Sequence, residues 1–425
     1  MKGVGKVAGA MFMAATMAIG LWSAAPASAA TQAELEAKIK MMEQTLNEMK
    51  SQLKQVQTTQ VQQQKAVEVA ATSKLPGWVE RMTFFGDTRF RYEATSYSNL
   101  NGKSKDGKDR FRVRLRFGVR SQISDDVELG MRMVTGADAD ATSTNQTMGN
   151  YFGEYSKWGL DQAYVKWTPS FVPQKAFMFE FGKVPQPFMT SKVIWDGDVV
   201  PEGAFAQWTF NKGGSWQPYV LGSYMTVEQT GTWGQNVYAP AGQLGIKGKV
   251  GAFGLKAETA YTSWGNLGDA GDVPPDTNGN PTWTQGDGET RISNFAVWDI
   301  YAKADYKFNK QGSVFAWGHY LVNQSADGPW QDQDTGWGAG AGVKYCKFGF
   351  NAWYKYVEAN ASPGFIADSD SGYVNRKGYV LSASYQMWKY GKVQLSWYDT
   401  EPVEENIPGA TNPSQTFFAD FIFKF

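Results

Sequence analysis

The stretch that decides the fold is the end of the chain, Phe417-Phe418-Ala419-Asp420-Phe421-Ile422-Phe423-Lys424-Phe425. Every second residue back from Phe425 is aromatic or apolar, whereas the intervening residues include Asp420 and Lys424. Side chains alternate between the two faces of a β-strand, so this strand has one apolar face and one face that tolerates charge. A chain that ends in this way is typical of a transmembrane β-barrel, whose last strand pairs with its first.

The first residues predict export from the cytoplasm. Lys2 and Lys6 accompany an apolar run from Val7 to Leu21, and Ala27-Ser28-Ala29 offers the small residues at which signal peptidases cut. We therefore expect residues 1–29 to be a cleaved signal peptide. No later apolar run reaches the length of about 18 residues that a transmembrane helix needs.

The overall composition fits strands that separate lipid from water. Mean hydropathy is −0.43, yet 15% of the residues are aromatic. Alternating strands explain both values, because half of each strand can be polar while aromatic residues form the two interfacial girdles. A secreted all-β sandwich or lectin is the alternative.

Charge and cysteine content exclude several classes of function. Lys plus Arg and Asp plus Glu each number 41, so the chain as a whole gives no reason to expect a nucleic-acid partner. Cys346 is the one cysteine, and neither CxxC nor CxxCH occurs. We expect no disulfide, no metal-thiolate site and no haem or other cofactor.

Residues 31–74 differ in kind from the rest, with no aromatic residue, glycine or proline. Apolar residues recur there by alternating steps of four and three, the spacing of a coiled-coil seam. The seam residues are Leu35, Ile39, Met42, Leu46, Met49, Leu53 and Val56, and Gln60 and Gln63 continue it. We predict a coiled-coil helix over 30–75, with a lone amphipathic helix as the alternative.

From Met82 onward the period changes to two, and residues 76–425 are predicted to form an antiparallel β-barrel of about sixteen strands. Connections alternate short and long, which places the short turns on one rim and the long loops on the other. The predicted short turns are Ser124–Asp126, Pro169–Gln174, Asn211–Ser215, Gly251–Ala252, Asn309–Gly312, Cys346–Lys347 and Lys389–Gly391. The longer segments lie near 96–108, 137–158, 184–203, 229–240, 263–291, 324–336, 359–377 and 400–414.

Arginines alternate with apolar residues along the second expected strand. An arginine at mid-depth in lipid costs about 2 to 4 kcal/mol, so this row is expected to face a water-filled lumen. Neighbouring strands add to the row. The predicted lumenal arginines are Arg89, Arg91, Arg110, Arg112, Arg114, Arg116, Arg120 and Arg132.

A proline-stiffened segment after the fifth strand can supply the opposite charge. It contains Val184-Pro185-Gln186-Pro187-Phe188 and then Asp196, Asp198 and Glu202. Stacked arginines repel one another, so we expect these carboxylates to face them if the segment folds inward. The arginines would then either select anions or mainly brace the acidic segment.

Several motifs resemble those of the porins of Gram-negative bacteria. They are Leu160-Asp161-Gln162-Ala163-Tyr164-Val165, Gly182-Lys183 followed by Pro185 and Pro187-Phe188, and the acidic stretch from Trp195 to Gly203. The chain is most similar to the putative-porin group and to anion-selective phosphate porins, some of which carry N-terminal coiled coils. The terminal aromatic strand also resembles the signature of outer-membrane proteins.

This resemblance implies a fold and a set of partners. In such porins the third extracellular loop folds into the barrel and forms a constriction, and residues 184–203 occupy that place here. The longer 263–291 segment is the alternative for this role. The resemblance further implies an outer-membrane location, contact with lipid, a homotrimer and a periplasmic stalk formed by the N-terminal helix.

We therefore predict an outer-membrane porin that lets small hydrophilic solutes diffuse passively, with a preference for anions. Alternatives are a channel specific for phosphate, dicarboxylates or sugars, and a barrel that anchors the envelope or serves as a scaffold through its stalk. A sheath around a cytochrome is less suitable, because it needs a wider barrel and a haem partner.

An enzyme is not expected. His319 is the one histidine, and the sequence shows no partner for it, so it is interpreted as a packing or lumen-lining residue. Asp276-Thr277-Asn278-Gly279-Asn280 resembles a calcium loop but lacks the closing glutamate, and an ordinary exposed turn is the alternative. No metal site is expected.

Overall fold

The computed structural model describes residues 31–72, 76–100, 105–136, 140–149, 151, 157–232, 234–268 and 273–425. The expected signal peptide lies outside the described residues. The chain divides into two units between residues 75 and 76. Each unit is described by itself.

The first unit is one long helix, α2 (Gln32–Thr72). Its sequence lacks glycine and proline, which favours an uninterrupted helix. The seam residues are exposed in the single chain, from 47% for Val56 to 64% for Met42. The helix thus carries an apolar stripe that the described part of the chain leaves uncovered. None of the described helices is both long and apolar enough to cross a membrane.

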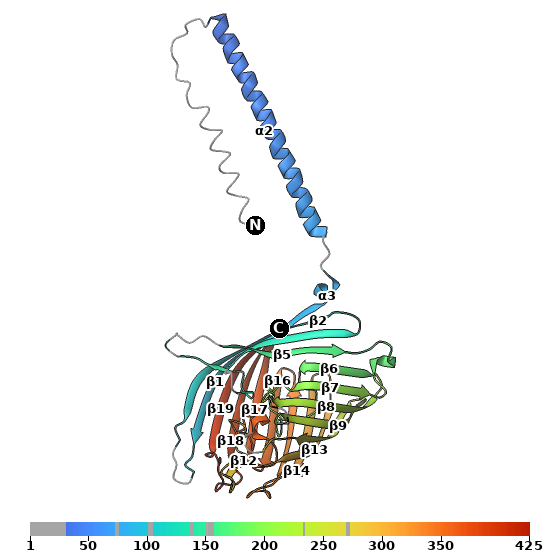
Figure 1. Cartoon of the computed structure of the whole chain (residues 1–425), viewed down its shortest axis with the longest axis vertical. Coiled ribbons are helices and arrows are strands. Elements are labelled where there is room, and N and C mark those ends of the chain that lie inside the picture. Colours follow the sequence, from blue (N-terminus) through green and yellow to red (C-terminus); the bar gives the residue numbers. More distant parts are fainter. Residues whose placement is uncertain are drawn as a thin grey trace. The chain divides into compact units, whose positions relative to one another are not determined.

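The second unit is a closed antiparallel barrel of 16 long strands, as predicted (Figure 1). A short helix, α3 (Gly77–Glu80), precedes it. The barrel strands are β1 (Met82–Tyr97), β2 (Lys108–Gln122), β3 (Val127–Thr135), β5 (Trp158–Trp167), β6 (Phe177–Lys183), β7 (Glu202–Thr209), β8 (Trp216–Glu228), β9 (Val237–Val250), β10 (Phe253–Trp264), β13 (Phe295–Lys307), β14 (Gly312–Asn323), β15 (Thr335–Tyr345), β16 (Phe348–Val357), β17 (Arg376–Trp388), β18 (Gly391–Pro402) and β19 (Ser414–Lys424).

The barrel closes where the chain ends. Strand β19 pairs with β1 in a register that sets Phe421 opposite Phe90 and Asp420 opposite Arg91. The backbones of Gly86 and Phe425 exchange two hydrogen bonds of 3.1 Å. The terminal aromatic strand therefore seals the sheet, which leaves no open edge in the membrane.

Short turns and long loops alternate along the barrel, as the sequence predicted. The long loops used below are L2 (136–157), L3 (184–201), L5 (265–294) and L7 (358–375). Strand β4 (Gln146–Thr147) in L2 pairs with β2, and β11 (Thr282–Thr284) and β12 (Thr290–Ile292) form a hairpin in L5. The 3-10 turns η1 (Pro173–Lys175) and η2 (Gly364–Ile366) complete the described elements.

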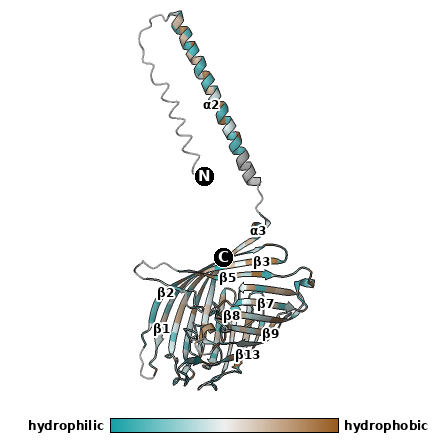
Figure 2. Cartoon of the chain, in the orientation of Figure 1, coloured by the Kyte–Doolittle hydropathy of each residue, from teal (hydrophilic) through white to brown (hydrophobic). Residues whose placement is uncertain are grey.

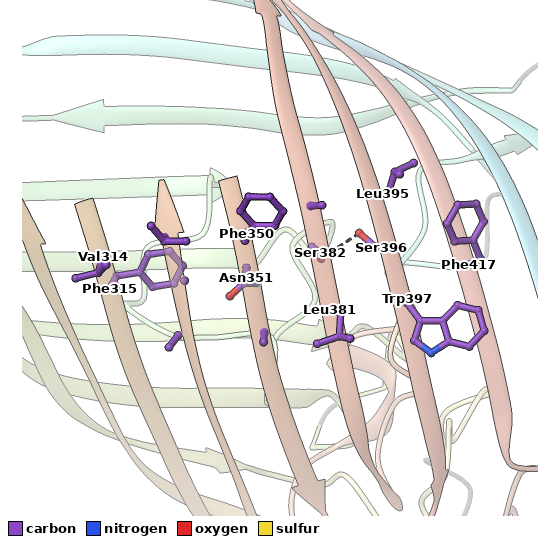
Figure 3. Close-up of a pocket in the computed structure, with 15 residues that line it drawn as sticks. Val314, Phe315, Phe350, Asn351, Leu381, Ser382, Leu395, Ser396, Trp397 and Phe417 are labelled. Carbon is purple, nitrogen blue, oxygen red and sulfur yellow. Dashed lines mark hydrogen bonds between the residues drawn. The ribbon is translucent and has the colours of Figure 1, made fainter. Parts of the chain in front are cut away.

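Hydrophobic and hydrophilic residues are interspersed along the same strands (Figure 2). The outward positions are apolar over β14–β19, where exposed side chains line a shallow hollow of about 650 Å³ (Figure 3). Its rim includes Phe350, Leu381 and Trp397, which are 40% exposed or more. Ser382 and Ser396, hydrogen-bonded at 3.1 Å, alternate with these residues and face the other way. The two faces therefore have the polarity of a wall between lipid and water.

Candidate functional site

Loop L3 lies inside the barrel rather than above it. Its residues Val184 and Val193 are at most 1% exposed. They belong to one apolar cluster with strand residues such as Phe205 and Leu321, which are fully buried. Because inward-facing residues of opposite strands contact this loop, it crosses the lumen. Residues 184–201 are thus the part of the expected 184–203 segment that forms this loop, and 202–203 belong to β7.

The C-terminal part of L3 is fixed to the arginine face of β2. Asp198 Oδ1 accepts hydrogen bonds from Arg114 Nη1 at 3.4 Å and from Arg116 Nη1 at 3.1 Å. The same two guanidinium groups also donate to Asp87 on β1, each at 2.7 Å. Arg114 and Arg116 therefore lie between a carboxylate of the wall and a carboxylate of the loop.

A second long loop, L7, reaches the same arginine face. Arg91 binds Asp420 of β19 through two hydrogen bonds of 2.7 and 3.0 Å and Asp370 of L7 at 2.9 Å. Its guanidinium also lies 3.8 Å from the ring centre of Phe418. The cation is thus held from three directions, and one of them is a loop that the sequence analysis did not assign to the site.

The remaining predicted arginines also lie on the lumenal face, and most have partners. Arg110 and Arg112 share Glu93 at 2.8 and 3.2 Å. The other contacts are Arg132 with Asp161, Arg89 with Asn145 Oδ1 at 2.6 Å, and Arg120 over the ring of Phe85 at 5.6 Å. The cationic row is therefore largely neutralised by carboxylates of the wall and the loops.

Glu202 does not join this site. It is the first residue of β7, is exposed, and pairs with Lys183 at the adjoining end of β6. The expectation that Glu202 faces the arginines is wrong, because strand β7 starts there and the residue is held in the β6–β7 register.

Loops L3 and L7 bind each other at the centre of the site. The Asp196 N–H donates to the Ile366 carbonyl at 2.7 Å, and Ser369 N–H donates back to Asp196 Oδ2 at 3.0 Å. Lys192 of L3 also donates to Asp368 of L7 at 2.5 Å. The constriction is thus made by two loops that act as one layer.

The loop carboxylates differ in their electrostatic environment. Burial raises the pKa of Asp196, and the adjacent Asp368 carboxylate raises it further, to about 8. Burial acts in the same direction on Asp198, but Arg114 and Arg116 outweigh it and hold the pKa of Asp198 below its usual range. At neutral pH, Asp198 is therefore the charged member of this pair.

The opposite side of L3 is fixed by uncharged groups and a histidine. Gln243 on β9 accepts from the Met189 N–H and donates to the Met189 carbonyl, both at 3.0 Å. Ser191 Oγ lies 2.7 Å from His319 Nδ1, and His319 Nε2 lies 2.9 Å from Asp299 Oδ1. The sequence showed no partner for His319, and the structure corrects this: the histidine joins β14 to L3 and β13.

Loop L5 closes over L7 without replacing L3 as the loop that contacts the arginines. Asn280 is 1% exposed and donates to the Ala359 and Ser362 carbonyls at 2.6 and 3.0 Å. The segment 276–280 is thus a turn that is exposed at Asp276 and buried at Gly279 and Asn280. Its buried end supports L7 through Asn280.

The comparisons with known proteins agree with this architecture. The model of a family described as "Putative porin" matches residues 8–106 and 102–262 of the chain. The chain belongs to this porin family. Its fold and family are those of an outer-membrane porin. No curated protein matches the sequence of the porin.

Solved structures of other outer-membrane proteins share the fold at low sequence identity. A high-pH structure of OprB from Pseudomonas putida is 11% identical, with a TM-score of 0.52 over 82% of this porin and 96% of that chain. The trimer form of OmpT from Vibrio cholerae is also 11% identical, with a TM-score of 0.49 over 81% and 99% of the two chains.

Lysines form a second cationic surface of the porin that the sequence analysis missed. Lys256 on β10 lies directly opposite Lys247 on β9 and Lys303 on β13. All three point to the lumen, because Lys256 shares a face with the buried Glu258. Nearer the short turns, a hollow of about 460 Å³ is lined by Lys344, Lys347, Lys389, Lys392 and Lys424. The register of adjacent strands, which the sequence does not give, brings these lysines together.

The mouth of the porin on the long-loop side has the opposite sign. A hollow of about 690 Å³ between the loops is lined by Phe365, Tyr373, prolines and the carboxylates Asp140, Glu228 and Asp276. No lysine or arginine is among its described lining residues. The two hollows therefore differ in charge, with carboxylates lining the one among the long loops and lysines lining the one near the short turns.

Proposed function

We propose that this porin lets small hydrophilic solutes diffuse passively across the outer membrane and that it prefers anions. The observation that carries the preference is the row of Lys247, Lys256 and Lys303 across three adjacent strands. Like charges placed directly opposite one another repel and raise the local concentration of mobile anions. Among the described residues, the structure assigns no carboxylate partner to Lys247 or Lys256.

The arginines have a different role in this proposal. Their ion pairs with Asp87, Asp198, Asp370 and Asp420 hold L3 and L7 in place, which supports a bracing role. The same arrangement puts positive charge on the wall against negative charge on the loops. The resulting transverse field orders water and favours dipolar or charged solutes over apolar ones.

We also propose a trimer with a periplasmic stalk made from three copies of α2. The exposed seam from Leu35 to Val56 supports this, because a narrow apolar stripe becomes buried only against other helices. Lipid of the outer membrane would then cover the remaining outward face of the barrel. The expected signal peptide would direct the chain to this compartment.

The test is the reversal potential of single channels in a salt gradient. Changing Lys247, Lys256 and Lys303 together to glutamine should shift the reversal potential towards cation preference. As a matched control, Lys40, Lys50 and Lys54 of α2 are changed to glutamine, which removes the same charge outside the barrel. An unchanged reversal potential in the barrel variant would refute the anion preference and leave the porin assignment intact.

A second variant distinguishes the role of the lysines from that of the arginines in the same measurement. Changing Arg112, Arg114 and Arg116 to glutamine also releases Asp87 and Asp198 from their ion pairs and leaves Glu93 paired with Arg110 alone. We expect a shift towards cations here too, but with noisier openings, since L3 loses its attachment. The lysine variant should keep quiet openings, because none of the three lysines contacts L3 in the ion pairs described.

A further inference from the structure

Three ionisable side chains converge beneath L3, and solute diffusion accounts for none of them. They are Glu258 of β10, Asp299 of β13 and His319 of β14, and each is at most 5% exposed. One donor atom of each lies within 4.8 Å of the donor atoms of the other two. We propose that they bind a divalent transition-metal ion of the zinc class, which fastens the constriction loop to the barrel wall.

The three groups are close enough to converge on one ion. His319 Nε2 lies 2.9 Å from Asp299 Oδ1. Two donor atoms of a tetrahedral zinc ion at about 2.0 to 2.2 Å are about 3.4 Å apart, so these two groups would separate by about 0.5 Å to admit the ion. One imidazole with two carboxylates is a nitrogen and oxygen donor set of the kind zinc accepts, whereas magnesium and calcium favour oxygen donors alone.

The two buried carboxylates, Glu258 and Asp299, favour a bound cation. Glu258 Oε2 accepts from Gln243 Nε2 at 2.9 Å, but Glu258 Oε1 is buried and has no hydrogen-bond partner. No described lysine or arginine forms an ion pair with Glu258 or Asp299. Two buried carboxylates are costly when His319 alone, and only if protonated, can offset their charge, whereas a divalent ion with a neutral imidazole makes the group electrically neutral. The ion would also give Glu258 Oε1 its missing partner.

The surrounding hydrogen bonds orient the donors as in known metal sites. A metal-bound histidine usually donates its other ring N–H to a polar partner, which fixes the ring. Here Ser191 Oγ lies 2.7 Å from His319 Nδ1 and also accepts from the Val193 N–H at 3.2 Å. Nε2 is therefore the nitrogen that points towards Asp299 and the ion.

This placement connects the site to the constriction. Ser191 and Met189 belong to L3, and they are held by His319 and by Gln243, the partner of Glu258. The ion would thus be joined to L3 through one hydrogen bond at Ser191 and through two successive hydrogen bonds, by way of Gln243, at Met189. An ion that binds more tightly when L3 is inward stabilises the inward position. The ion should therefore hold L3 in place.

The experiment measures zinc binding to the full-length porin in detergent. The protein is made without a polyhistidine tag and carries Cys346→Ser, so that His319 and the three-residue group are tested without a thiol or added imidazoles. After removal of metal with a chelator, titration calorimetry with zinc and elemental analysis should give one ion per chain. Cobalt should bind at the same site and produce a visible absorption band.

Variants of the ligands decide the assignment. Glu258→Gln, Asp299→Asn and His319→Gln should each weaken zinc binding by at least about tenfold and abolish the cobalt band. The matched control is Glu180→Gln, another buried acid on an inward strand position, which pairs with Lys166 and should leave binding unchanged. Folding of each variant is checked by its β-sheet circular dichroism.

Ser191→Ala keeps all three ligands and provides a second test. It should weaken zinc binding by about tenfold, because the orienting partner of His319 is lost. Zinc should also reduce the current noise of the wild-type channel but have a smaller effect on Ser191→Ala. The proposal is overturned if the wild-type protein binds no stoichiometric zinc, or if folded His319→Gln binds zinc as the wild type does. In that case the two carboxylates share a proton instead.

Discussion

Asp198 Oδ1 lies 3.1 Å from Arg116 Nη1, and this contact joins the C-terminal part of an inward loop to the second strand of the barrel's first hairpin. The same carboxylate also accepts from Arg114, so one acidic side chain fastens L3 to two arginines. Both partners are largely buried, with 12% of the Asp198 side chain and 17% of the Arg116 side chain exposed. The loop is therefore held by charge on one wall and by Gln243 and His319 on the other.

Asp198→Asn should loosen L3 and leave Arg114 and Arg116 with excess positive charge. Charge-assisted hydrogen bonds of this kind contribute about 1.5 to 3 kcal/mol each, so loop docking should weaken by that order. We expect noisier single-channel currents and a stronger anion preference in a salt gradient. Glu202→Gln is the control, because its pair with Lys183 is half exposed and contributes at most about 1 kcal/mol. Quiet currents in Asp198→Asn would contradict the proposed fastening.

The raised pKa of Asp196 predicts a loss of loop stability at alkaline pH. The folded-state pKa is about 8 and the ordinary value is 3.8, so the folded loop holds the proton more tightly than the unfolded one. The stabilising contribution is therefore complete below about pH 4 and is lost as the pH rises through about 8. Single-channel noise should increase between pH 7 and pH 9 in the wild type. Asp196→Asn, which cannot ionise, should remove this increase, and an unaltered pH profile would refute the assignment.

Gly338 on β15 marks a close approach between the wall and L3. A Cβ added there would lie 2.5 Å from Val193 Cγ2 and 3.1 Å from the Tyr354 carbonyl oxygen. Gly338→Ala should therefore push L3 away and destabilise the folded barrel by about 1 to 3 kcal/mol, as overpacking does in other cores. Thermal unfolding in detergent measures this. Gly222→Ala is the control, since a Cβ at that strand position meets nothing within 4 Å. Equal melting temperatures for the two variants would show that the space between Gly338 and Val193 can accommodate a methyl group.

Met42 lies on the seam of α2 and Met41 lies beside it, with exposures of 64% and 69% in the single chain. If α2 forms a trimeric stalk, Met42→Ser removes apolar area from a buried seam, whereas Met41→Ser changes an outer position. Sedimentation of the detergent-solubilised porin should show fewer trimers for Met42→Ser than for Met41→Ser. The stalk proposal fails if both variants sediment as the wild type does.

The barrel itself was readable from local patterns. Alternation in the strand from Phe417 to Phe425 and in the arginine row of β2 reflects one physical constraint, namely that a strand between lipid and water has two unlike faces. The alternation of short turns and long loops was readable for a similar reason, because a membrane barrel carries tight turns on one rim and longer loops on the other. The prediction that the segment after the fifth strand folds inward rested on its carboxylates and on a resemblance, and in the structure Val184, Val193 and Ile194 of this segment pack in the buried apolar cluster.

What only the tertiary structure decided is which charges meet. Register sets Lys247, Lys256 and Lys303 in one row. Loop L7 brings Asp368 and Asp370 to Lys192 of L3, although these residues lie far apart in the chain. The sequence determined the periodicity, since each strand responds locally to lipid and water. It did not determine the partners of His319, because contacts between strands and folded loops depend on barrel closure, and no single segment carries that information.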